Sequence, residues 1–100
     1  GHRILSAAAV KAMRTVPRRA AKFGRTPGWD CHSDYASNNG DMLRQATYGH
    51  TGFTGTSIVI DPVNDVSVIL LTNSVHPDGK GYVIALRSYV ANAVASSIIK

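Results

Sequence analysis

YGHTGFTGTSIVIDPVNDVSVILLTNSVHP, residues 48–77, is the stretch that decides the fold. Its second part holds two runs of β-branched and apolar residues, 57–60 and 66–71, a composition typical of strands. Residues 61–65 between them are Asp-Pro-Val-Asn-Asp, residue types that favour a turn. The pattern predicts a hairpin. Because the second run is apolar at nearly every position, we also expect a sheet covered on both faces, with helices on each side.

The first part of this stretch is rich in glycine and in hydroxyl groups. Its glycines lack side chains, so another backbone or a ligand can approach the chain closely there. Its threonines, Thr51 among them, supply short polar groups, and His50 adds a residue type that titrates near neutrality. We therefore expect the chemistry of the chain at the strand edge formed by residues 48–56.

Helices are expected at both ends of the chain, with irregular structure between the first of them and the hairpin. Ser6 is a good N-cap for a helix over residues 7–14, and Pro17 should end it. Residues 18–47 are rich in Gly, Pro, Ser, Asn and Asp, which predicts mostly loop, with a tight turn at Asn39-Gly40.

The last helix is predicted from apolar residues at helical spacing after the loop of residues 77–81. Its apolar stripe should face the sheet, while Arg87 and Asn92 should be exposed. The residues of the stripe are Val83, Leu86, Val90, Ala93 or Val94, and Ser97.

The segment from Tyr48 to Pro77 resembles the C-terminal part of the penicillin-recognising serine hydrolases, the family of class C β-lactamases, DD-peptidases and related esterases. His50-Thr51-Gly52 occupies the place of that family's Lys-Thr-Gly triplet, and the hairpin, Thr72-Asn73 and a C-terminal helix follow in the family's order. Ile4-Leu5-Ser6 before a helix and Gly28-Trp29 in a loop resemble it less specifically. The resemblance implies an α/β fold of the α+β type, with antiparallel strands flanked by N- and C-terminal helices, as part of a β-lactamase/transpeptidase-like domain.

The resemblance also implies roles for residues at the strand edge. His50 would line the site opposite the serine and help to hold a substrate carboxylate or orient the proton network. Thr51 would offer its hydroxyl to the substrate, Gly52 would keep the edge open, and the backbone N–H of Phe53 would be an oxyanion donor. Trp29 would either flank the substrate pocket or simply pack. Because His replaces the family's Lys, ester or peptide hydrolysis is better supported than β-lactam hydrolysis.

The family's nucleophile and base are not found in this sequence. Only Ser97 is followed three positions later by Lys, and Lys100 is the last residue, with nothing left to build a site around it. No tyrosine begins a Tyr-x-Asn element. We therefore expect residues 1–100 to be a C-terminal fragment of a serine hydrolase domain, completed by an N-terminal part. It would act on a small-molecule or peptide substrate without a cofactor; a non-catalytic remnant is the alternative.

Positive charge is concentrated near the beginning of the chain. Seven of the 11 Lys and Arg residues precede the first acidic residue, Asp30, whereas residues 27–100 carry a net charge of −2. Such a segment is usually a solvated face. In a binding or assembly module it would instead contact an anionic partner, while the hairpin edge pairs with another chain. Nucleic acid is not an expected partner, since Arg18-Arg19 and their neighbours lack interleaved aromatic residues.

No metal site is expected. Neither Cys-x-x-Cys nor His-x-x-x-His spacing occurs among the candidate ligands Asp30, Cys31, His32 and His76. The neighbouring His32 is the only sequence feature that would favour Cys31 as a nucleophile. A single cysteine cannot form an internal disulfide. Neither a signal peptide nor a run of about eighteen apolar residues is present. The family resemblance implies the periplasm or an association with the bacterial cell envelope.

Overall fold

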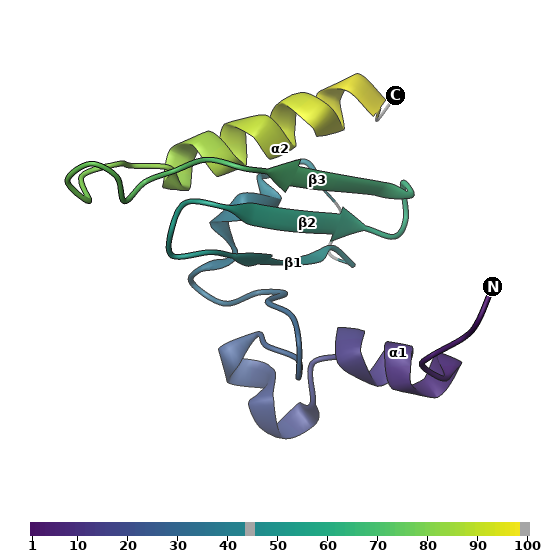
Figure 1. Cartoon of the computed structure of the whole chain (residues 1–100). Coiled ribbons are helices and arrows are strands. Elements are labelled where there is room, and N and C mark those ends of the chain that lie inside the picture. Colours follow the sequence, from purple (N-terminus) through teal and green to yellow (C-terminus); the bar gives the residue numbers. More distant parts are fainter. Residues whose placement is uncertain (44–45, 99–100) are drawn as a thin grey trace.

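The computed structural model describes residues 1–43 and 46–98 and shows a three-stranded antiparallel sheet with helices from both ends of the chain (Figure 1). The strands are neighbours in the order β1-β2-β3. This α+β arrangement confirms the predicted fold class. The elements are α1 (Ala7–Arg14), the 3₁₀ helices η1 (Arg18–Phe23) and η2 (Ala36–Asn39), β1 (Tyr48–Thr51), β2 (Ser57–Asp61), β3 (Val66–Leu70) and α2 (Ile84–Ile98).

The predicted hairpin is confirmed, and Asp61 closes it. Strands β2 and β3 pair antiparallel, with Val59 opposite Val68. The buried Asp61 carboxylate accepts hydrogen bonds from the backbone N–H groups of Val63 and Asn64, at 2.8 and 3.2 Å from Oδ1. These bonds replace the water that the carboxylate loses on burial, which explains why Asp begins this turn.

The described residues cover one face of the hairpin more completely than the other. The side chains of Ser57 and Val59 are buried on the face toward η2 and α2. On the opposite face Ile69 is 62% exposed, and Leu71, just beyond β3, is 80% exposed. Alternate residues of a strand point to opposite faces, and the register puts Tyr48 on the Ile69 side, where Trp29 and Arg14 of α1 contact its ring. The prediction that both faces are covered therefore fails at the β3 end of this side, within the part of the chain that the structure describes.

Helix α2 packs through a different face from the one predicted. Its buried residues are Arg87, Ala91 and Ala95, spaced four positions apart. The alanines are small enough for the helix to lie close to η2. The predicted stripe is wrong, because Leu86 and Ser97, two of its members, are exposed.

The expected exposure of Arg87 and Asn92 is also wrong. The Arg87 guanidinium is buried because it finds backbone carbonyls to donate to. Asn92 is half-buried, and its Oδ1 accepts a hydrogen bond of 2.7 Å from the backbone N–H of Asp41. Polar contacts with distant segments thus decide how the helix is turned, and these contacts leave no trace in helical periodicity.

The segment before β1 is more ordered than a loop. Helix α1 begins as predicted, since Ser6 Oγ accepts a hydrogen bond of 3.1 Å from the backbone N–H of Ala9. The predicted loop contains η1 and η2, and Gly40 ends η2 with a φ of 65°, in agreement with the predicted turn. Residues 44–45 of this loop, and Lys100 of the discounted Ser97 motif, lie outside the described residues. None of the described helices is long and apolar enough to cross a membrane.

The segment of residues 25–30 adds a short pairing beyond the edge of β1. Asp30 and Gly49 exchange backbone hydrogen bonds of 2.8 and 2.9 Å, and Arg25 forms a bridge with Asp30. On its other sides Gly49 is packed against β2 and η2, because a Cβ there would lie 2.2 Å from the backbone oxygen of Ile58 and 3.1 Å from Nδ2 of Asn38. Residue 49 must therefore have no side chain.

We expect Gly49→Ala to lower the free energy of unfolding by about 2–3 kcal/mol, because the added methyl group collides with backbone that cannot move aside. Gly28→Ala is the matched control. Its Cβ would meet only the end of the Met13 side chain, at 3.4 Å, so we expect a change within about 0.5 kcal/mol. Urea unfolding of both variants measures the difference, and equal stabilities would contradict the packing described here.

Candidate active site

Strand β1 ends in a tight turn at the edge of the sheet. The backbone N–H of Gly52 donates to the carbonyl of Thr56 at 2.7 Å, and the N–H of Gly55 donates to the carbonyl of Gly52 at 3.1 Å. We call residues 52–56 the 52–56 turn. A Cβ on Gly52 would lie 2.3 Å from Thr56 Oγ1, so this position also excludes a side chain. The turn thus keeps the end of β1 accessible.

A groove of about 340 Å³ runs along this end of the sheet. It brings together His50, Thr51 and Gly52 of the predicted site, and the hydroxyl of Thr51 makes no hydrogen bond within the described residues. The residues that line the groove are His50, Thr51, Gly52, Thr56, Ser57, Ile58, Ile69 and Leu71.

Phe53 lies next to this groove. Its side chain is 93% exposed, and it lines an adjoining cavity of about 270 Å³ that also reaches Thr51, Gly52 and Arg87. The backbone N–H of Phe53 has no hydrogen-bond partner in residues 1–43 and 46–98. An unpaired N–H on an exposed residue is free to donate to a bound oxygen.

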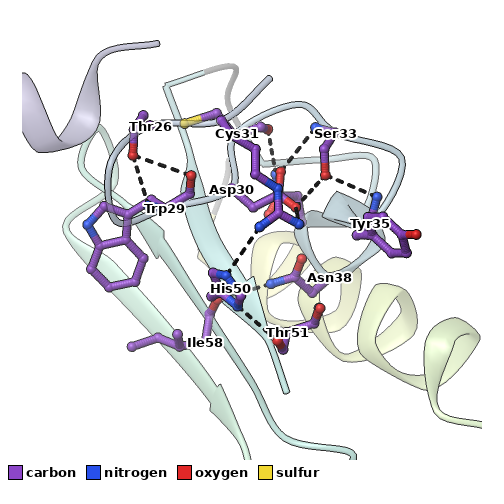
Figure 2. Close-up of polar contacts among 12 residues, drawn as sticks. Thr26, Trp29, Asp30, Cys31, Ser33, Tyr35, Asn38, His50, Thr51 and Ile58 are labelled. Carbon is purple, nitrogen blue, oxygen red and sulfur yellow. Dashed lines mark hydrogen bonds and ion pairs between the residues drawn. The ribbon is translucent and has the colours of Figure 1, made fainter. Parts of the chain in front are cut away.

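His50 is held at both ring nitrogens, as Figure 2 shows. Its Nδ1 lies 2.8 Å from the carbonyl oxygen of Thr51, and its Nε2 lies 3.4 Å from Nη1 of Arg25. A carbonyl can only accept a hydrogen bond and a guanidinium can only donate one. These partners therefore assign a neutral ring with the proton on Nδ1 and the lone pair on Nε2.

Arg25 is positioned by a buried carboxylate. Its Nη2 lies 3.3 Å from Oδ2 of Asp30, whose side chain is buried, and its guanidinium lies over the Tyr35 ring, 5.9 Å from the centroid. Asp30 is held in turn by Ser33, whose backbone N–H donates to Oδ1 at 3.0 Å and whose hydroxyl donates to Oδ2. These contacts thus run from Ser33 through Asp30 and Arg25 to His50.

Arg25 and Asp30 are site residues that sequence reasoning missed. Arg25 is 25 residues away from His50 in the chain, and Asp30 was considered only as a metal ligand. What brings them to β1 is the backbone pairing between Asp30 and Gly49. The basic residue types around Arg25 gave no signal of this, because a bridge of one residue pair has no sequence pattern of its own.

Trp29 packs beside β1 and is not among the residues that line the groove. Its ring meets the Tyr48 ring edge to face, with centroids 5.2 Å apart, and its backbone N–H donates to Oγ1 of Thr26 at 2.8 Å. Arg14 of α1 lies over the same Tyr48 ring, 5.7 Å from its centroid. The packing role of Trp29 is thus observed, and its role as a wall of the substrate pocket stays a prediction.

Cys31 is a buried free cysteine next to this network. Burial, and to a lesser extent the negative charge of Asp30, raise the pKa of the Cys31 thiol. A nucleophilic cysteine needs the opposite shift, so this thiol is suited to packing. In the described part of the chain, no three His, Cys, Asp or Glu side chains lie close enough together to hold a metal ion.

Comparison with known proteins identifies the family. The sequence profile of the family described as Beta-lactamase matches residues 1–91, so the chain belongs to the Beta-lactamase family of serine hydrolases. Proteins named "Putative D-alanyl-D-alanine carboxypeptidase" from Escherichia coli O157:H7 and Escherichia coli (strain K12) are 39% and 37% identical to it over 75 residues, or 73% of this chain. The matched region spans 17% of the length of either relative. No solved structure gives a significant match.

Because the raised pKa of Cys31 belongs to the folded state, folding stability should fall at alkaline pH. The unfolded chain loses the thiol proton near pH 8.5, while the folded chain keeps it to a higher pH. We expect the melting temperature to decline more steeply from about pH 8 upward for the natural chain than for Cys31→Ala. Thermal unfolding at several pH values measures both slopes, and parallel curves would contradict the assigned shift.

Proposed function

We propose that this chain is the C-terminal part of a serine hydrolase that forms and then hydrolyses an acyl-enzyme, and that it supplies the His-Thr-Gly wall of the active site. The observation that carries the proposal is the position of His50, with Nδ1 at the Thr51 carbonyl and Nε2 toward Arg25, at the end of a strand whose next turn holds the free Phe53 N–H. Membership of the Beta-lactamase family and the names of the relatives support the same reaction class.

The reaction would proceed in two steps. A serine hydroxyl outside this chain attacks the substrate carbonyl, the bond to the leaving group breaks, and the leaving group takes up a proton. Water then attacks the carbonyl of the resulting ester, and the bond to the serine oxygen breaks. The acid is released, and a proton from the water restores the serine hydroxyl. The Phe53 N–H would donate to the carbonyl oxygen as it becomes negative, and no cofactor is required.

The substrate we propose is a peptide or ester whose acyl part lies along the groove at β1. The hydroxyl of Thr51 is free to contact a carboxylate or carbonyl of such a substrate. Arg25 adds a positive charge at the rim, half-exposed and beside His50, which favours a substrate that carries a carboxylate. The relatives' names include a D-alanyl-D-alanine peptide, so we include peptides that end in D-alanine and place the protein at the cell envelope or in the periplasm.

The partner that we propose for the open face of the sheet is the N-terminal part of the same domain. Ile69 and Leu71 are exposed on this face, and β3 has no neighbour on its outer edge among the described residues. Burial of such side chains contributes about 1.5–3 kcal/mol each, so a covering segment would be strongly favoured. The alternative is a non-catalytic module that pairs with another chain through the same edge. Acylation of a serine distinguishes the two, because a non-catalytic module would not be acylated.

Acylation of the complete polypeptide that carries this chain tests the proposal. A fluorophosphonate or penicillin probe should label a serine outside residues 1–100. Thr51→Val should lower the labelling rate by about 10–100-fold, because one hydrogen-bond donor to the substrate is lost. Thr54→Val is the matched control. It lies in the same turn, is exposed and does not line the groove, so we expect its labelling rate to stay within about twofold of the natural rate.

Two results would refute this function. One is a polypeptide of natural sequence in which no serine reacts with either probe. The other is an equal labelling rate for Thr51→Val and Thr54→Val, which would remove Thr51 from the site. Where labelling occurs, mass spectrometry of the labelled peptide identifies the serine.

A further inference from the structure

Arg87 of α2 is a buried cation without a carboxylate partner among the described residues. Its side chain belongs to a residue that is 8% exposed, and its Nε has no hydrogen-bond partner. Burial lowers the pKa of the Arg87 guanidinium, as expected for a charge that loses water. A buried charge lowers the stability of the fold unless its remaining contacts compensate for the hydration that it loses.

The contacts that Arg87 does make are both with the 52–56 turn. Its Nη2 donates to the carbonyl oxygen of Gly52 at 2.9 Å and to that of Thr56 at 3.1 Å. These carbonyls belong to the first and last residues of the turn, so a single guanidinium nitrogen joins its two ends. The turn is also attached to residues 72–74, because the Ser74 N–H donates to the Thr54 carbonyl at 2.8 Å and the Thr72 hydroxyl to the Gly55 carbonyl at 2.7 Å. Arg87 attaches the turn to α2.

We propose that Arg87 is a positioning residue that fixes the 52–56 turn against α2, so that the backbone N–H of Phe53 is held in place to receive the substrate oxygen. This inference rests on the proposed function. Phe53 directly follows one of the two carbonyls that Arg87 holds, and both residues line the same cavity. An oxyanion donor is most effective when it need not reorganise during the reaction, and an attachment at both ends of the turn provides that rigidity.

Packing alone does not account for an arginine at this site. The other buried positions of α2 are alanines, and an apolar side chain at residue 87 would avoid the loss of hydration. The guanidinium offers five N–H donors in a fixed plane, which suits two carbonyls a short distance apart. What it contributes beyond an apolar residue is therefore the hold on Gly52 and Thr56.

The test compares Arg87→Met, Arg87→Lys and Asn92→Ala in the complete polypeptide. Asn92 is the matched control, because it also ties α2 to another segment, through Asp41, but has no contact with the turn. Amide hydrogen exchange at Gly52 and Gly55 reports on the turn directly, since both N–H groups bond within it. The rate of acylation and the dissociation constant of the substrate, measured separately, report on the Phe53 N–H.

For Arg87→Met we expect exchange at Gly52 and Gly55 to accelerate at least about tenfold and acylation to slow by about 10–100-fold, with substrate affinity within about twofold. Arg87→Lys should recover much of the rate, and Asn92→Ala should change neither readout at the turn. Unchanged exchange in Arg87→Met, or faster exchange with an unchanged acylation rate, would overturn the inference. If the natural polypeptide is not acylated at all, the proposed function fails, and so does the role of Arg87 in positioning the Phe53 N–H. Amide hydrogen exchange at Gly52 and Gly55 still decides whether Arg87 holds the turn.

Discussion

The backbone pairing of Asp30 with Gly49 is the contact on which the arrangement of the candidate site depends. It attaches the segment of residues 25–30 to β1 through two backbone hydrogen bonds. The amide of Asn38 supports the same region from η2, by donating to the backbone oxygen of Ile58 at 3.0 Å. Gly49, a residue type that usually weakens a strand, leaves room for the Ile58 backbone and the Asn38 amide, and its pairing with Asp30 brings Arg25 to His50.

Two arginines hold the two sides of the strand end by different means. Arg25 is half-exposed, paired with Asp30, and donates to the ring of His50. Arg87 is buried, lacks a carboxylate partner in the described part of the chain, and donates to carbonyls of the 52–56 turn. Both act through hydrogen-bond geometry, because a guanidinium can only donate and therefore dictates what its partner must be. The strand end consequently presents a neutral imidazole and a free N–H in fixed places.

Local patterns in the sequence predicted the hairpin, its turn at Asp61 and the helix capped by Ser6, because each depends on neighbours in the chain. The residues His50, Thr51 and Gly52 could be placed together because they are consecutive. The burial of Arg87 and the approach of Arg25 could not be predicted in this way. Both depend on contacts between residues 25 or more positions apart, which helical or strand periodicity does not encode.

The exposed side of β3 shows the same limit. The apolar run predicted correctly that residues 66–70 form a strand, yet whether a strand is covered depends on what packs against it. Within the described residues, η2 and α2 cover the side that carries Val59, whereas the side that carries Ile69 is covered at Tyr48 by Trp29 and exposed at β3. An all-apolar strand therefore indicates that a second face is available for burial, without saying which segment buries it.

The contacts of His50 with Arg25 and with the carbonyl of Thr51 require the neutral tautomer with its proton on Nδ1. Nitrogen-15 NMR of the labelled histidine ring tests this most directly, because a protonated and an unprotonated ring nitrogen have clearly different chemical shifts. We expect a protonated Nδ1 and an unprotonated Nε2 in the natural chain, with that preference lost in Arg25→Ala. A protonated Nε2 in the natural chain would contradict the contact with Arg25 and the site built on it.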